Sequence, residues 1–281
     1  MKAPANQPTL TLNTGDIIPQ MGLGVFKVDD EAVCEQIVSD ALEVGYRHID
    51  TAMIYRNEAA VGRAIASSGI PRDEIFVTTK LWNSDQGAET SAAAFQKSLD
   101  LLGLDYVDLY LIHWPAPLRN TYFETWLELE KLYAAGVAKA IGVSNFQIEH
   151  LERVLEGGSV VPAVNQIECH PAFQQPDIRG FQEPKGILTE AWGPLGQAKY
   201  ELAELPGLTD IAQAHGKSIQ QVVLRWHLQE GVIVFPKTVK KERLVENLSV
   251  FDFTLSEDEM ATMRAMDAGK RVGTHPDEGN W

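Results

Sequence analysis

The sequence predicts a single (β/α)8 barrel, a closed sheet of eight parallel strands surrounded by helices. Short apolar runs rich in β-branched residues alternate with helical patterns from about residue 21 to residue 266. No linker or change in composition interrupts this alternation, and 281 residues is an ordinary length for one barrel. An open doubly wound sheet is the alternative, but its glycine-rich first turn is absent. We therefore treat residues 1–281 as one domain.

A hairpin is expected to precede the barrel. Residues 9–12 and 17–19 flank Asn13-Thr14-Gly15-Asp16, a composition typical of turns. This hairpin would close the bottom of the barrel. The predicted barrel strands are residues 21–23, 47–50, 75–80, 106–112, 138–143, 163–167, 186–191 and 231–235.

Helices are predicted where apolar residues recur three or four positions apart. In the first such run, Val33, Ile37, Ala41 and Val44 share one face. Gly103 illustrates the glycine that often follows a helix end. The predicted helices are residues 30–44, 58–67, 88–102, 119–135, 148–155, 177–182, 209–215, 218–229, 241–248 and 256–266.

Gly22 and Gly24 form a G-x-G pair at the first predicted strand. The pair lacks the third glycine and the long preceding strand of a Rossmann fingerprint, so it argues only weakly for dinucleotide binding of that kind. It indicates more clearly a backbone that is crowded against a neighbouring part of the chain.

Composition excludes several classes of function. The net charge of −15 argues against a nucleic-acid or anionic-membrane partner. No apolar run approaches the roughly 20 residues that span a bilayer, and the first residues lack the apolar core of a signal peptide. The two cysteines, Cys34 and Cys169, are expected to be buried thiols in a reducing compartment. These features predict a soluble cytoplasmic protein.

Polar or aromatic residues stand at seven of the eight predicted strand ends. Chemistry in a (β/α)8 barrel takes place at the carboxyl ends of its strands. Turn formation alone would favour glycine, aspartate, asparagine and serine there, and would not explain a lysine, a histidine or a glutamine. Any one of these could be a structural ion pair or a core histidine, but their convergence predicts an active site. The strand-end residues are Asp50, Lys80, His113, Ser144 with Asn145, Gln166 with Glu168, Trp192 and Lys237.

Six stretches of the chain resemble the aldo-keto reductase family. They are GYRHIDTAMIYRNEAAVG, TTKLWN, VDLYLIHWP, IGVSNF, PAVNQIECHP and WGPLGQ, and the resemblance runs from about residue 22 to residue 253. WGPLGQAKY, VLRWHLQEG, VFDF and HPDE further resemble the bacterial diketogluconate reductase type. The resemblance implies reduction of small aldehydes, ketones or dicarbonyls, and the family's precedent favours a monomer.

The same resemblance implies a catalytic tetrad of Asp50, Tyr55, Lys80 and His113. A hydride that adds to a carbonyl carbon leaves an alkoxide that needs a proton, and tyrosine keeps its proton at neutral pH yet can donate it to so basic an oxygen. Lys80 would lower the pKa of Tyr55, and Asp50 would hold the lysine. His113, expected to be neutral, would orient the carbonyl oxygen.

A nicotinamide cofactor is also implied. Ser144, Asn145 and Gln166 would bind its carboxamide, Trp192 would stack on its ring, and residues 193–197 would run along its pyrophosphate. The expected cofactor-binding residues in this part of the site are Gly24, Ser144, Asn145, Gln166, Trp192, Gly193, Leu195 and Gln197.

A basic cluster, FPKTVKKER at residues 235–243, stands out in an acidic chain. Cations at the start of a helix oppose its dipole, and a bound phosphate would remove that conflict. In the resemblance, Lys237, Thr238 and Arg243 match positions that bind the adenosine 2′-phosphate, which favours NADPH over NADH. The remaining cofactor positions expected here are Val239, Lys240, Glu246 and Asn247.

Aromatic residues just beyond the strand ends predict an apolar substrate pocket. Phe26, Trp82 and Trp114 would form its wall, although rim aromatics also commonly pack under loops. Asn83 and Trp281 would complete it, and the short C-terminal segment, which includes His275, suggests an open site for small carbonyls. The other histidines lack ligand spacing, so no metal is expected.

Two other functions compete with the reductase. A glycoside hydrolase on the same barrel would use two of Asp50, Glu168 and Glu190. It would leave Lys80, Tyr55 and the basic cluster without a role. A barrel that binds NADPH as a sensor without turnover would have no need of all four tetrad groups.

Overall fold

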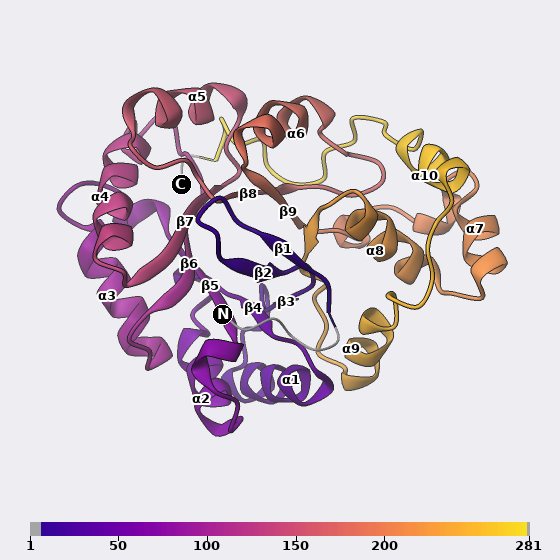
Figure 1. The fold of residues 1–281 in the computed structure, drawn as a ribbon, viewed down its shortest axis with the longest axis horizontal. Helices are drawn as coiled ribbons and strands as arrows, with labels where there is room; N and C mark the ends of the chain where they lie inside the picture. Colours follow the sequence, from indigo (N-terminus) through magenta and orange to yellow (C-terminus); the bar gives the residue numbers. More distant parts are fainter. Residues whose placement is uncertain (1–6, 280–281) are drawn as a thin grey trace.

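The computed structural model describes residues 7–279, and within them one sheet contains eight parallel strands (Figure 1). Each strand pairs with the next along the chain, in the order β3 to β10. The strands are β3 Leu23–Gly24, β4 His48–Asp50, β5 Phe76–Leu81, β6 Val107–Ile112, β7 Ala138–Ser144, β8 Val164–Glu168, β9 Leu188–Trp192 and β10 Ile233–Val234.

The first and last strands meet and close the sheet. Met21 bridges Val234 in parallel, and the Val234 carbonyl accepts a hydrogen bond of 2.9 Å from the Gly22 amide. A Cβ added at Gly22 would lie 2.8 Å from the Phe235 ring. The crowding that the G-x-G pair predicted is therefore the contact that closes the barrel, and the (β/α)8 prediction is confirmed.

Helices surround the closed sheet (Figure 1). Predicted and observed ranges agree to within three residues at each end, with the largest differences at two helix starts. One of these helices begins at Tyr122 rather than at residue 119, because Asn120 adopts a left-handed conformation (φ 55°) that interrupts a helix. The helices are α1 Glu31–Val44, α2 Glu58–Ser67, α3 Ser91–Leu102, α4 Tyr122–Ala134, α5 Ile148–Gly157, α6 Pro176–Gln182, α7 Leu208–His215, α8 Ile219–Gln229, α9 Lys241–Leu248 and α10 Glu257–Arg264.

Helix α1 shows how the local sequence sets these boundaries. The Asp30 side chain caps the helix by accepting a hydrogen bond of 2.9 Å from the Val33 amide. Gly45 ends the helix in a left-handed conformation with φ 119°. The buried face is Cys34, Ile37, Val38, Ala41 and Leu42, whereas Val33, which we expected on that face, is 43% exposed.

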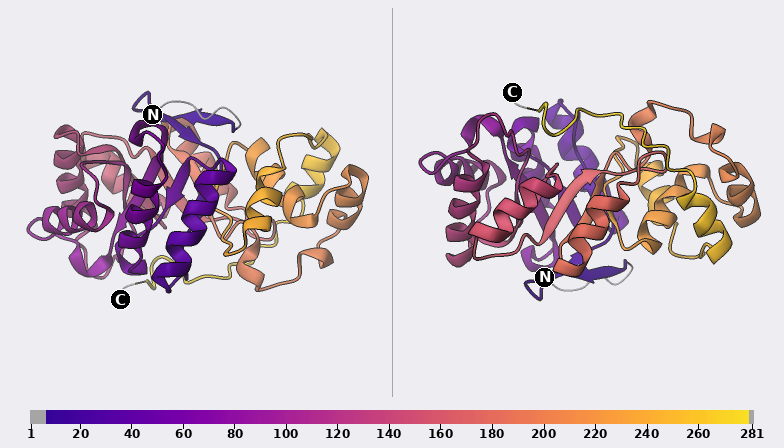
Figure 2. Two further views of the ribbon diagram at one scale, coloured as in Figure 1. Left: turned by 90° about the horizontal axis from the view of Figure 1, so that it is seen from below. Right: turned by 90° about the horizontal axis from the view of Figure 1, so that it is seen from above.

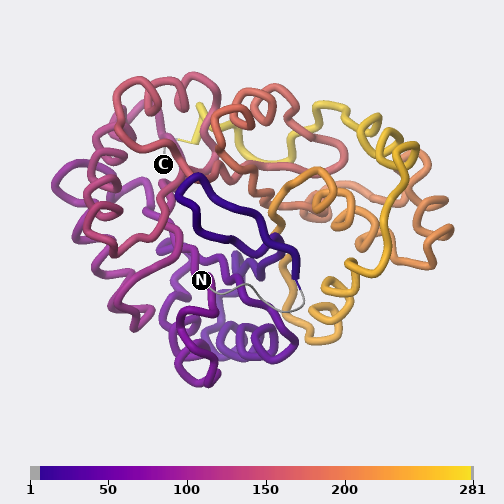
Figure 3. Tube along the Cα trace, in the orientation of Figure 1, coloured from indigo at the N-terminus to yellow at the C-terminus, as the bar shows by residue number. Residues whose placement is uncertain are grey.

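The predicted hairpin is present and covers one end of the barrel. Strand β1, Thr9–Thr11, pairs antiparallel with β2, Ile17–Pro19. Leu12 and Ile18 pack with residues of β5, β6 and β7 in one apolar cluster. In Figure 3 the hairpin crosses the centre of the barrel, and Figure 2 shows the C-terminal segment at the opposite end.

Two main apolar layers hold the helices. One lies between the strands and the inner faces of most helices, and the other joins α7, α8 and α10. Both cysteines are buried, as expected. Among residues 7–279, no helix is long and apolar enough to cross a membrane.

We predict that Gly62→Ala destabilises the fold. An added Cβ in α2 would lie 2.2 Å from the Leu102 carbonyl oxygen at the end of α3, and backbone cannot easily move away. Overpacking of this kind costs about 1–3 kcal/mol, which thermal unfolding monitored by circular dichroism would detect. Gly180→Ala, in α6 with no atom within 4 Å of the added Cβ, is the matched control and should leave Tm unchanged or raise it. Equal Tm values for both variants would contradict this close-packing argument.

Candidate active site

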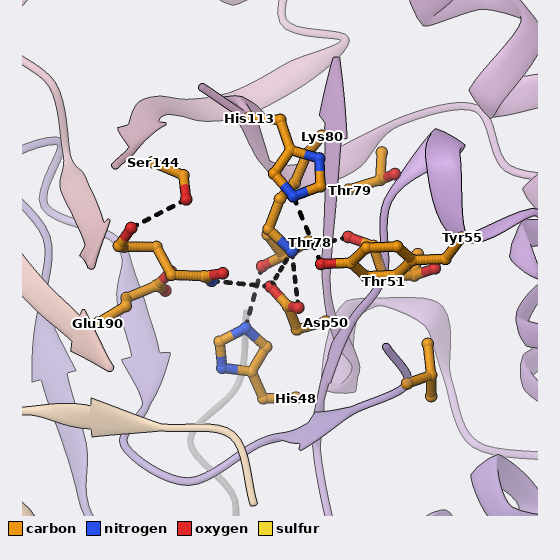
Figure 4. Close-up of polar contacts among 12 residues, drawn as sticks. His48, Asp50, Thr51, Tyr55, Thr78, Thr79, Lys80, His113, Ser144 and Glu190 are labelled. Atoms are coloured by element: carbon orange, nitrogen blue, oxygen red, sulfur yellow. Dashed lines mark hydrogen bonds and ion pairs between the residues drawn. The ribbon is translucent and has the colours of Figure 1, made fainter. Parts of the chain in front are cut away.

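The four residues of the expected tetrad lie together (Figure 4). Asp50 ends β4, Lys80 lies in β5, and His113 follows β6, so parallel pairing brings all three to one end of the barrel. The Lys80 ammonium donates hydrogen bonds to both oxygens of Asp50, at 2.7 and 2.8 Å, and to the Thr51 carbonyl at 3.0 Å. The lysine side chain is fully buried.

A short turn after β4 brings Tyr55 over this ion pair. Tyr55 ends a single 3₁₀ turn, Met53–Tyr55, and the next residue, Arg56, adopts φ 58°. The Tyr55 hydroxyl lies 3.5 Å from His113 Nε2, and the Lys80 ammonium lies 5.3 Å from the centre of the Tyr55 ring. The hydroxyl is therefore in reach of the imidazole at the mouth of the barrel.

Asn57 holds this turn, a role that the sequence analysis missed. Its side chain accepts a hydrogen bond of 2.7 Å from the Thr51 hydroxyl and donates to the Val25 and Val28 carbonyls at 3.0 and 3.2 Å. It occupies the N-cap position of α2 but makes no capping bond there. From the sequence, Asn57 looks like an ordinary N-cap residue. Its actual partners are recognised only in the tertiary structure.

The ion pair sets the charges of its neighbours. Burial works against the charged lysine, but Asp50, together with the smaller effects of Tyr55 and Glu190, outweighs burial and raises the pKa of Lys80. Burial and the nearby ammonium together hold the pKa of His113 well below its ordinary value. At neutral pH the site therefore contains the Lys80 ammonium and the neutral imidazole of His113. A neutral His113 can donate a hydrogen bond without adding a charge.

The pKa of Tyr55 departs from the expectation. Lys80 does lower it, but burial of the phenolate has the larger effect, and the net result is a pKa raised to about 12. Tyr55 is consequently protonated across the neutral range and well suited to donate a proton rather than to accept one.

Gln166 and Glu190, both buried, continue the hydrogen-bonded cluster from Asp50, and Glu190 is labelled in Figure 4. One amide group, Gln166 Nε2, donates to Asp50 and to Glu190, each at 2.9 Å. Burial and the charge of Asp50 raise the pKa of Glu190 to about 8. Because both hydrogens of the Gln166 amide are engaged, only its carbonyl oxygen remains for a ligand. From the sequence, Glu190 is a candidate only for the hydrolase alternative.

Ser144, Asn145 and Trp192 join the same cluster. The Ser144 hydroxyl donates to the Gln166 backbone carbonyl at 2.8 Å, and the Asn145 side-chain amide donates to the His113 backbone carbonyl at 2.9 Å. The Trp192 indole N–H donates to the Asn145 side-chain oxygen at 2.7 Å. The residues expected to bind a nicotinamide thus stand beside the tetrad.

The loop after β9 has the backbone expected for close approach to a ligand. Gly193 and Gly196 have φ of +61° and +69°, and Gln197 has φ 52°. A Cβ added at Gly196 would lie 2.4 Å from the Tyr200 ring. Leu195 is half-buried and Gln197 is exposed. Gly24 is buried against Phe235, on the line where the barrel closes.

The basic cluster surrounds the start of α9. Lys237, Val239, Lys240 and Arg243 are exposed, whereas Thr238 is buried and its hydroxyl accepts from the Lys240 amide at 3.0 Å. Lys240 stands at the N-cap and makes no side-chain capping bond.

Three other residues at this helix make internal contacts. Lys241 pairs with Glu43 at 2.6 Å and with Asp40 at 3.5 Å, so its charge is already balanced by α1. Glu246 accepts from the Ser218 hydroxyl at 2.7 Å, and Asn247 is buried. Lys241, whose charge is balanced by two carboxylates of α1, thus differs from the exposed Lys237, Lys240 and Arg243.

Aromatic rings flank Tyr55 and His113. The Phe26 ring, 45% exposed, lies 5.0 Å from that of Tyr55, and the Trp82 ring lies 5.2 Å from that of His113. Trp114 is half-buried and packs close to Gly279, and Asn83 is buried. Trp281 lies outside the described residues.

The three carboxylates of the hydrolase alternative are engaged in other contacts. Asp50 binds Lys80, Glu190 binds Gln166, and Glu168 accepts hydrogen bonds from the Val272 and Gly273 amides. Asp50 and Glu190 are buried with the Gln166 amide group between them, so that group occupies the space where a bond to be cleaved would lie.

The geometry defines a reductase-like site at the carboxyl end of a (β/α)8 barrel, and comparison with known proteins assigns the family. The model of the aldo/keto reductase family matches residues 20–268. The chain is 51% identical over 269 residues to an aldo-keto reductase of Mycolicibacterium smegmatis, covering 96% of this chain and 97% of the relative. It is 49% identical over 270 residues to the glyoxal reductase of Bacillus subtilis, covering 96% of each.

Solved structures agree. The NADPH complex of a mutant of Gox0644 superposes with a TM-score of 0.93 at 43% identity, covering 98% of this chain and 99% of that one. A Bombyx mori aldo-keto reductase in complex with NADP gives a TM-score of 0.89 at 35% identity, covering 96% of each chain. This chain belongs to the aldo/keto reductase family and is an oxidoreductase. The narrower resemblance to the diketogluconate reductase type stays a prediction.

We predict that Glu190 makes stability fall as pH rises. Its pKa is raised from 4.5 to about 8, so between these values the folded protein keeps a proton that the unfolded chain has lost. Stability is therefore greatest below the lower value and declines through the upper one. Glu190→Gln removes the titration and keeps an acceptor for Gln166. The Tm of Glu190→Gln minus the Tm of wild type should therefore be larger at pH ~8 than at pH ~5, by at least about 2 °C.

Calorimetry across that pH range provides the measurement. Glu242→Gln, at an exposed position of α9, is the control and should track wild type at every pH. A difference between Glu190→Gln and wild type that does not change with pH would show that Glu190 is ionised in the folded protein.

Proposed function

We propose that this protein reduces small aldehydes, ketones or dicarbonyls to alcohols with NADPH, and that Tyr55 is the general acid. The observation that carries the proposal is the cluster of Lys80, Asp50, Tyr55 and His113 at the carboxyl end of the barrel, with Lys80 buried on Asp50 at 2.7 Å. A sensor would not need a protonated phenol, an ammonium and a neutral imidazole held around one point.

The chemistry divides among the four residues. Bound NADPH supplies the hydride that adds to the carbonyl carbon. His113 donates a hydrogen bond to the carbonyl oxygen, which orients it and offsets its developing charge. Tyr55 then transfers its phenolic proton to that oxygen, and the adjacent Lys80 ammonium stabilises the phenolate that remains. Asp50 keeps the ammonium in place and balances its charge.

The residues around the site fit the cofactor in two places. Gln166 presents only its carbonyl oxygen, because both amide hydrogens are engaged with Asp50 and Glu190. That oxygen would accept from the nicotinamide carboxamide, whose other contacts would come from Ser144 and Asn145. At the far end, Lys237, Thr238 and Arg243 would hold the 2′-phosphate at the uncapped start of α9.

The substrate pocket would lie between Phe26 and Trp82, whose rings flank Tyr55 and His113. Apolar walls beside one proton donor suit a small carbonyl compound with a short apolar group. The glyoxal reductase among the relatives supports a dicarbonyl. A cytoplasmic location, which the two buried free thiols favour, and a monomer, which the family precedent favours, complete the proposal.

Replacing Tyr55 with Phe should lower kcat for methylglyoxal by about 100-fold or more, because general acid catalysis contributes on that order. NADPH affinity should stay within about twofold of wild type, since the lost hydroxyl meets the substrate rather than the cofactor. Loss of reduced-nicotinamide absorbance gives the rate, and quenching of tryptophan fluorescence gives the affinity. Ordinary turnover by the variant would exclude Tyr55 as the acid.

Arg243→Ala should weaken NADPH binding by roughly 10-fold or more and leave NADH binding within about twofold, because the lost contact is to the 2′-phosphate. Lys241→Ala is the matched control, since Lys241 is already paired with Glu43 and Asp40. It should change neither affinity by more than about twofold. Equal losses for NADPH and NADH in Arg243→Ala would contradict the assignment.

A further inference from the structure

Glu168 is a buried carboxylate that lies outside the tetrad. It ends β8 and is 1% exposed, yet it accepts hydrogen bonds at both oxygens. One oxygen accepts from the Val272 amide at 2.6 Å and from His170 Nε2 at 3.1 Å, and the other from the Gly273 amide at 2.9 Å. Burial opposes its charge, but these contacts outweigh burial and lower its pKa. The carboxylate is therefore charged, which strengthens each bond.

The amides that Glu168 binds belong to residues 267–279, which we call the C-terminal strap. The strap has no regular helix or strand and lies at the end of the barrel opposite the hairpin (Figure 2). Its first part is held by hydrogen bonds of 3.1 and 2.9 Å from the Ala268 and Lys270 amides to the Ala172 carbonyl. Beyond Gly269, Glu168 accepts hydrogen bonds from two consecutive strap amides and lies 4.0 Å from the Arg271 guanidinium, so this single buried anion contributes much to the placement of the strap.

The strap lies directly against the proposed nicotinamide-stacking residue. A Cβ added at Gly273 would lie 2.4 Å from the Trp192 ring and 2.7 Å from Glu168. Further along, a Cβ at Gly279 would lie 3.0 Å from the Trp114 ring. The strap thus runs from Trp192 to Trp114 of the proposed substrate pocket. Glu168 contacts the strap at Gly273, where the strap packs against Trp192.

A second set of contacts leads from Glu168 to the loop after β9. His170 Nδ1 lies 2.9 Å from the Tyr200 hydroxyl, and the Tyr200 ring covers Gly196. A proton on His170 Nε2 satisfies both neighbours, because Nε2 then donates to Glu168 and Nδ1 accepts from Tyr200. Lys270 of the strap also lies 5.0 Å from the centre of the Tyr200 ring. The strap and loop 193–200 therefore share one partly buried polar connection.

We propose that Glu168 is a positioning residue that fixes the strap over Trp192, and that the Glu168–His170–Tyr200 connection couples the strap to loop 193–200. This rests on the proposed function, in which that loop lies along the cofactor pyrophosphate. Cofactor binding then orders the loop, the ordered loop holds the strap, and the strap limits the size of carbonyl that reaches Tyr55. By reciprocity, a strap held in place strengthens NADPH binding.

Trypsin tests the coupling, because the strap contains Lys270 and Arg271. Cleavage at these residues reports how often the strap leaves its site. In wild type, saturating NADPH should slow this cleavage by at least about threefold, whereas in Tyr200→Phe the protection should fall below about half of that. Tyr106→Phe, at the opposite end of the barrel where Tyr106 contacts Arg72, is the matched control and should retain full protection.

A measurement of NADPH affinity by tryptophan fluorescence distinguishes failure of the proposed function from failure of the coupling. If wild type does not bind NADPH, the proposed function fails. If wild type binds NADPH but its strap is not protected, or if Tyr200→Phe is protected as well as wild type, the coupling is wrong and the proposed function stands.

Glu168→Gln tests the positioning role independently. An amide in place of one carboxylate oxygen would present N–H groups to the N–H groups of the strap, so the strap should loosen. We expect faster cleavage at Lys270 and Arg271 without NADPH, and a rise in kcat/KM for bulky aromatic aldehydes relative to methylglyoxal of at least about threefold. A variant that loses activity on all carbonyls equally and keeps the wild-type cleavage rate would overturn the role. If Glu168→Gln does not fold, Gly273→Ala provides the same readouts, since its methyl group displaces the strap from Trp192.

Discussion

The buried ion pair between Lys80 and Asp50 is the interaction on which the rest of the site depends. An ammonium with no exposure inside a barrel is tolerated only because both carboxylate oxygens and a backbone carbonyl accept its hydrogen bonds, at 2.7 to 3.0 Å. Burial and the charge of Lys80 together lower the pKa of His113 and keep it neutral, and the same charge partly offsets the effect of burial on the pKa of Tyr55. Removal of either partner would leave a buried charge without compensation, so the pair constrains geometry and electrostatics together.

Closure of the barrel brings residues of distant strands to this pair. Asp50 and Lys80 come from neighbouring parallel strands, and the contact of Met21 with Val234 completes the ring of strands around them. Gln166 and Glu190 lie across the interior from the same aspartate. The interior therefore contains three ionisable groups within one hydrogen-bonded network, and the raised pKa of Glu190 keeps a second negative charge away from Asp50 near neutral pH.

The carboxyl end of the barrel carries a second buried anion with a different task. Glu168 contacts backbone amides rather than a lysine, and it links a segment without regular structure to the loop that follows Trp192. The two carboxylates have separate proposed roles, one in the reaction and the other in the access of substrate to the site. In the proposed mechanism Asp50 supports the group that assists proton transfer, whereas in its proposed role Glu168 supports the segment that lies over the site.

The sequence by itself determined the fold class, the order of strands and helices, and the residue types at the strand ends. Periodicity and glycine signals are local, and they placed helix boundaries to within about three residues. The direction of the Tyr55 pKa, the role of Asn57, the engagement of Glu190 and Glu168 and the pairing of Lys241 were decided only by the tertiary structure. Each depends on burial or on a partner distant in sequence, and desolvation together with long-range hydrogen bonds leaves no periodic trace along a chain.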